Sequence, residues 1–81
     1  MASAKRHGIG DADILSAYAF ALAYFTEESG ERPLTVVIGP DRSGAVLLEL
    51  GVVQCHDYDA ICIVQAMPAR SASLRKAGLR G

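Results

Sequence analysis

The chain has 81 residues, of which 51% are hydrophobic and only 6% aromatic, and its formal net charge is −1 at pH 7. This length predicts one small domain with a thin aliphatic core and leaves little room for a buried cofactor, so none is expected. A charge this close to zero does not by itself indicate nucleic-acid binding. No apolar run approaches the roughly 18 residues that a membrane span needs, and no signal core is present, so we expect a cytoplasmic protein without membrane contact.

The first predicted element is a helix that begins at Gly10 or Asp11, either of which can act as N-cap. Asp11 and Asp13 place negative charge in its first turn, where the helix dipole favours it. Its expected apolar face consists of residues at helical spacing, namely Ile14, Leu15, Tyr18, Ala21 and Leu22. Residues 23–26 are rich in strand formers, which predicts a change from helix to strand near Leu22.

The rest of the chain has the pattern of antiparallel strands joined by turns. The polar residues 27–33 predict a turn, and residues 34–38 a short β-branched strand. Residues 39–44, with Pro40 and Gly44, predict a hairpin connection to a long strand at 45–55. Gly51 indicates a bulge or bend within that strand.

The last strand is expected at residues 60–66, after a turn at 56–59, and Pro68 ends it. Ser71 can then cap a short C-terminal helix, or the tail frays. The chain is therefore expected to form one α+β domain over residues 1–81, with an N-terminal helix on a three- or four-stranded antiparallel sheet. Residues 1–4 and 77–81 are expected to fray.

Apolar residues on both faces of the strand at 45–55 predict that part of the second sheet face is covered by a second copy or by a different chain. A homo-oligomer or a hetero-complex is therefore expected. Cys55 and Cys62 have no companions at the spacing of a zinc site, so we expect ordinary thiols and no metal centre.

Arg70 follows directly on the last strand, so the sheet delivers a guanidinium to its own end. Arginine grips phosphate or carboxylate through two N–H groups at once. Basic residues also gather near both ends of the sequence, which would form one basic face if the ends meet in space; they are Lys5, Arg6, His7, Arg70, Arg75, Lys76 and Arg80. The alternative for Arg70 is a surface residue that caps the sheet in water.

Three motifs resemble small actinobacterial toxin-like proteins related to the BrnT family. They are Lys5-Arg6-His7-Gly8-Ile9 before the helix, the hairpin motif at residues 37–44, and Ala66-Met67-Pro68-Ala69-Arg70 after the last strand. The resemblance spans Lys5 to Arg70 and implies a RelE-type fold and a ribonuclease toxin neutralised by a cognate antitoxin. The chain departs from the family pattern at Gln65, where relatives often carry a histidine, and at residues 71–74, where they are more basic and aromatic.

RNA cleavage without a metal needs a proton carrier and a cation that stabilises charge on the phosphate. His7 is the expected proton carrier because its reference pKa of about 6.5 suits either role. Arg70 is the expected phosphate clamp. Four further cations are expected to bind the RNA backbone, namely Lys5, Arg6, Arg42 and Arg75. The expected substrate is mRNA, on or off the ribosome.

Several of these residues can also have a purely structural role. His7 can be a surface or capping residue, and Arg42 a turn residue paired with Asp41 or Glu49. The aromatic residues Tyr18, Tyr24 and Phe25 are expected to pack in the core and sheet rather than to stack on bases. Glu49 is first expected to face solvent, and alternatively to pair with an arginine of the site and orient it.

Two other functions fit the same sequence. One is a non-enzymatic module that binds a protein through its uncovered sheet face. The other is a degenerate toxin that keeps the fold and partner binding but has lost nuclease activity.

Overall fold

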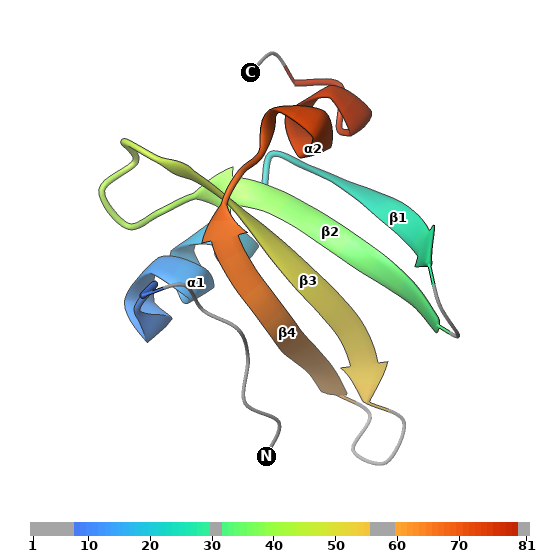
Figure 1. Cartoon of the computed structure of the whole chain (residues 1–81). Helices are drawn as coiled ribbons and strands as arrows, with labels where there is room; N and C mark the ends of the chain where they lie inside the picture. Colours follow the sequence, from blue (N-terminus) through green and yellow to red (C-terminus); the bar gives the residue numbers. More distant parts are fainter. Residues whose placement is uncertain (1–7, 30–31, 56–59, 80–81) are drawn as a thin grey trace.

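The computed structural model describes residues 8–29, 32–55 and 60–79 and shows the predicted α+β fold (Figure 1). In chain order the elements are α1 (Asp11–Ala19), β1 (Ala23–Ser29), β2 (Arg32–Pro40), β3 (Leu47–Cys55), β4 (Ala60–Pro68) and α2 (Ser71–Lys76). The strands form one antiparallel sheet in the order β1-β2-β3-β4, so each strand pairs with its neighbours in sequence. The change from helix to strand near Leu22 is confirmed, as is a helix start with Gly10 as N-cap.

β1 and β2 extend into residues 27–29 and 32–33, where the sequence predicts a turn. The polar side chains there led to that wrong prediction. β1 is an edge strand: among the described strands only β2 lies beside it, and polar residues are common at such an edge.

Helix α1 packs on one face of the sheet through a narrow contact. Ile14 and Ala17, three residues apart, are buried against β2 and β3. Gly39 makes the contact possible, because a Cβ at this position would collide with the backbone oxygen of Ala17. The predicted apolar face is therefore wrong in part: Leu15 stays 66% exposed and Tyr18 43% exposed. The helix makes its closest approach to the sheet through Ala17, while the larger side chains of Leu15 and Tyr18 remain exposed.

The opposite face of the sheet is partly covered by α2, as Figure 1 shows. Val36 and Ile38 of β2 form a buried cluster with Leu74 of α2, whereas the intervening Val37 belongs to the cluster under α1. This division follows from the alternation of side chains along a strand. Part of the cover that the sequence led us to expect from another chain is therefore supplied by the protein's own C-terminal helix.

The C-terminal end of α2 is closed by a Schellman motif. The N–H of Leu79 donates to the carbonyl of Leu74 (2.8 Å), and that of Gly78 donates to Arg75 (3.1 Å). Gly78 has a φ of 80°, which a side chain would disfavour. Of the ends expected to fray, 77–79 thus take part in hydrogen bonds, and 1–4 and 80–81 lie outside the described residues.

The bulge expected at Gly51 is confirmed. The pairing of β3 with β4 shifts between Gly51 and Val52, and Gly51 lies opposite Gln65. Cys62 of β4 is disulfide-bonded, so the expectation of an ordinary thiol at this position is wrong. Neither described helix is long and apolar enough to cross a bilayer.

Candidate functional site

Arg70 and Glu49 form the main polar contact between the end of the sheet and α2. The Nε and Nη2 of Arg70 donate to the two carboxylate oxygens of Glu49, at 3.2 and 2.9 Å. The backbone N–H of Arg70 donates to the same carboxylate at 2.8 Å. The Glu49 side chain is 0% exposed, whereas that of Arg70 is 58% exposed. A fully buried carboxylate therefore holds a guanidinium that still faces solvent.

The charge states of the pair follow from these contacts. Burial raises the pKa of Glu49, but hydrogen bonds from the side chain and backbone of Arg70, together with one from the Ser73 hydroxyl, bring it below its ordinary value. The hydrogen bond to Glu49 raises the pKa of Arg70. Both groups are thus ionised near neutral pH, and the carboxylate is fully engaged by its neighbours.

The local sequence explains why the pair forms. Arg70 is the residue that precedes the first turn of α2, and the backbone of Ala69 is anchored by a hydrogen bond to Leu47 of β3 (2.9 Å). Glu49 lies between Leu48 and Leu50, which face α1, so its own side chain points to the face that carries α2. The expectation that Glu49 faces solvent is wrong. The alternative, that it pairs with and orients an arginine, agrees with the structure.

The Arg70 guanidinium has N–H donors that Glu49 does not use. An arginine has five N–H donors, and Glu49 takes one from Nε and one from Nη2. Among the described residues no other acceptor binds this guanidinium, so three N–H groups are left for a ligand on the solvent side. Such a rigid, charged group with remaining donors is suited to an oxygen of a phosphate or carboxylate.

Gln65 lies on the same sheet face as this pair. Gln65 is on β4 and pairs with Gly51 of β3. This pair lies two positions along the strands from the pair of Glu49 and Met67. A Cβ on Gly51 would lie 2.6 Å from the Cγ of Gln65, so the glutamine side chain occupies the space above the glycine. Gln65 is therefore near the candidate site.

The other predicted site residues are dispersed or lie outside the described residues. Arg75 is exposed on α2, the helix that Arg70 precedes. Arg42 is exposed on the β2–β3 hairpin, where its backbone N–H donates to Asp13 of α1 (3.0 Å). Its predicted pairing partners are otherwise engaged, because Ser43 binds Asp41 and Arg70 binds Glu49. Lys5, Arg6 and His7 lie outside the described residues.

Ser73 was not identified as a site residue from the sequence. It is buried on α2, and its hydroxyl donates to the Glu49 carboxylate. A serine in a short amphipathic segment gives no distinctive signal. The only indication in the sequence is Glu49 itself. An acidic residue in the middle of an apolar strand needs a polar partner if it is buried.

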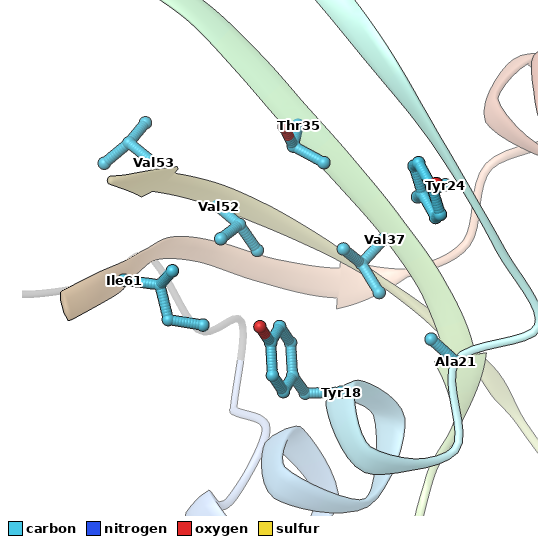
Figure 2. A pocket seen from close by; sticks show the side chains of 8 residues that line it. All are labelled: Tyr18, Ala21, Tyr24, Thr35, Val37, Val52, Val53 and Ile61. Atoms are coloured by element: carbon cyan, nitrogen blue, oxygen red, sulfur yellow. The ribbon is translucent and has the colours of Figure 1, made fainter. Parts of the chain in front are cut away.

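A second feature is an open groove of about 520 Å³ on the other sheet face (Figure 2). We call it the apolar groove. Among the described residues, those that line it are all uncharged: Tyr18, Ala21, Tyr24, Thr35, Val37, Val52, Val53 and Ile61. Tyr18 reaches over the sheet from α1, and Tyr24 stands on β1. These side chains are 43% and 74% exposed, so their prediction as core residues is wrong. Phe25 packs against the α2 cluster as expected.

The apolar groove and Arg70 lie on opposite faces of the sheet. Val37 and Val52 of the groove belong to the cluster under α1, whereas Glu49 points toward α2. A ligand in the groove and an anion on Arg70 would therefore be separated by the sheet.

Comparison with protein-family models, curated proteins and solved structures gave no match to this chain. Among the described residues, no group of three or more His, Cys, Asp and Glu side chains is arranged to hold a metal ion.

Proposed function

We propose that this protein is a toxin-like ribonuclease that binds mRNA through Arg70 and cleaves it by attack of a 2′-hydroxyl on the adjacent phosphate. The supporting observation is that the Arg70 guanidinium is more than half exposed although a buried carboxylate fixes two of its donors. The BrnT resemblance supplies the RNA substrate and a cognate antitoxin as partner.

In the proposed reaction, the 2′-oxygen forms a bond to phosphorus while the bond from phosphorus to the 5′-oxygen breaks. Arg70 stabilises the negative charge that grows on the non-bridging oxygens. His7 acts as the proton carrier, as base toward the 2′-hydroxyl or as acid toward the departing 5′-oxygen, and solvent water takes or supplies the other proton. Lys5, Arg6, Arg42 and Arg75 add attraction for the RNA backbone.

Inducible expression tests this function. The wild-type chain is expected to arrest growth and shorten the lifetime of mRNA, and Arg70→Ala and His7→Ala are each expected to relieve the arrest. Ser71→Ala, which alters an exposed residue beside Arg70, is the matched control and should leave the arrest intact. Normal growth and intact RNA on induction of a soluble, folded wild-type chain would contradict the ribonuclease proposal.

A second candidate function, a non-enzymatic protein-binding module, is favoured by the apolar groove. Exposed aromatic side chains beside aliphatic ones are typical of protein interaction sites. A degenerate toxin would combine this binding with an inactive Arg70 site, and the departure at Gln65 is consistent with that. An induced chain that leaves RNA intact yet loses a partner when Tyr24 is changed to serine would favour this candidate.

A further inference from the structure

We propose that the outer edge of β1, together with the apolar groove, binds an extended segment of another protein as a fifth strand of the sheet. The segment carries a lysine or arginine and, four residues later, a large apolar side chain. This inference rests on the protein-binding role described above and does not depend on whether Arg70 supports cleavage.

The edge of β1 is open to strand addition. β1 is the first strand in the sheet order, and among the described strands only β2 pairs with it. An edge strand presents backbone N–H and C=O groups that another strand can bind, and such main-chain pairing is a common mode of peptide recognition.

The side chains of β1 differ on its two faces. Phe25 and Glu27 point toward α2, where Lys76 lies 3.3 Å from the Glu27 carboxylate and 5.9 Å from the centre of the Phe25 ring. Tyr24, Thr26 and Glu28 point to the face of the groove, by strand alternation, and all three are exposed. The α2 face of β1 is thus occupied, whereas the groove face is available to a ligand.

The groove face specifies the chemistry of the added strand. Tyr24 lines the groove and offers contact to an apolar side chain, while Glu28, four residues further along β1, offers a carboxylate. Four residues of extended chain span about 13 Å. The other pairings of this sheet are all antiparallel, and an antiparallel segment meets Glu28 before Tyr24, so its basic residue precedes its apolar residue.

These features also favour this occupant over two others. RNA is disfavoured because none of the described residues that line the groove is charged and Glu28 would repel a phosphate. A second copy of the chain would offer its own β1, whose sequence Ala-Tyr-Phe-Thr-Glu-Glu-Ser has no basic residue to pair with Glu28. A strand from a different protein that carries a basic and an apolar side chain makes the contacts that RNA and a second copy of β1 cannot make.

Two synthetic nine-residue peptides test the inference. The basic peptide is Thr-Thr-Arg-Thr-Val-Thr-Ile-Thr-Thr, and the acidic peptide has Glu in place of Arg. Wild-type protein is expected to bind the basic peptide up to about fivefold more tightly, since an exposed charge pair contributes up to about 1 kcal/mol. Backbone amide resonances of residues 23–29 should shift in ¹H–¹⁵N spectra, and their hydrogen exchange should slow.

Variants locate the contacts. Glu28→Lys should reverse the preference, so that the acidic peptide binds more tightly, and Tyr24→Ser should weaken both peptides. Glu28→Gln should reduce the preference, whereas Ala12→Lys, which makes the same one-unit change of net charge at an exposed position of α1, should leave it unchanged. Circular dichroism of each variant confirms that the fold is kept.

Several results would overturn the inference. One is the absence of binding at about 1 mM of either peptide, a weak limit for a specific site. A second is a homodimer that forms through β1 and is detected by light scattering without peptide. A third is a shift of the amide resonances of residues 23–29 on addition of single-stranded RNA. Peptide binding that shifts groove resonances such as those of Tyr18 and Ile61 but leaves β1 unaffected would exclude strand addition while the protein-binding role stands.

Discussion

Glu49 and Arg70 are joined by three hydrogen bonds, of which the shortest, at 2.8 Å, comes from the backbone N–H of Arg70. The contact fixes the start of α2 relative to β3 and orients the guanidinium at the same time. Arg70 is therefore both a structural link and the candidate phosphate ligand, and tests of its function need measurements that separate the two roles.

The first prediction concerns the pH dependence of stability. The pKa of Glu49 lies below its ordinary value of 4.5 in the folded chain, so the unfolded chain binds a proton more readily as pH falls. The stability from this group is present above the unfolded pKa and is lost as pH falls through the folded pKa. Glu49→Gln should cost about 2 kcal/mol at pH 7, and the difference from wild type should shrink in acid.

Urea unfolding at pH 7, 5, 4 and 3 measures this difference. Asp41 has a lowered pKa too, chiefly because Ser43 donates a hydrogen bond to it, so it contributes in the same direction. Asp41→Asn in the Glu49→Gln background separates the two groups. A Glu49→Gln deficit of equal size at every pH would show that the lowered pKa of Glu49 is not the cause.

The second prediction concerns Ser73, which is buried and donates to Glu49. Ser73→Ala should lower the free energy of unfolding by about 1 kcal/mol, because the buried carboxylate loses one of its donors. For a domain of this size that corresponds to a fall in Tm of roughly 4–8 °C. Ser71→Ala, at an exposed position two residues earlier, is the control and should change Tm little.

The third prediction concerns the close contact of α1 with the sheet. Gly39→Ala places a methyl group against the backbone of Ala17, so α1 must move, at a cost of about 1–3 kcal/mol in the free energy of unfolding. Gly10→Ala adds a methyl group with no atom within 4 Å and should cost less than about 1 kcal/mol, through the poorer N-cap. Equal losses in urea unfolding would show that the contact between Gly39 and Ala17 does not limit the packing of α1.

The fold was largely predictable because its signals are local. Alternating apolar residues, the hairpin connection that follows Pro40 and contains Gly44, and the glycine at the Gly51 bulge are each recognisable within a few residues of sequence. The wrong predictions concern features that tertiary contacts determine. The face of α1 that is buried depends on the absence of a side chain at Gly39. Gly39 lies more than twenty residues away in sequence from Ile14 and Ala17, so no periodicity within the helix indicates this contact.

The candidate site was less predictable. The position of Arg70 after the last strand followed from the sequence, but the burial of Glu49 depends on α2 folding back over the sheet. Short helices such as α2 gain their stability from packing rather than from propensity, so their placement is not read from local sequence. The exposure of Tyr24 likewise reflects its place on the edge strand β1.

The central claim is that the solvent-facing donors of Arg70 bind an RNA phosphate. The most direct test is the salt dependence of binding to a single-stranded RNA, compared between the wild-type chain and Arg70→Ala. Loss of one phosphate contact should reduce the slope of log K against log salt concentration by about 0.7. Equal slopes for the two proteins, with folding verified by circular dichroism, would contradict the claim.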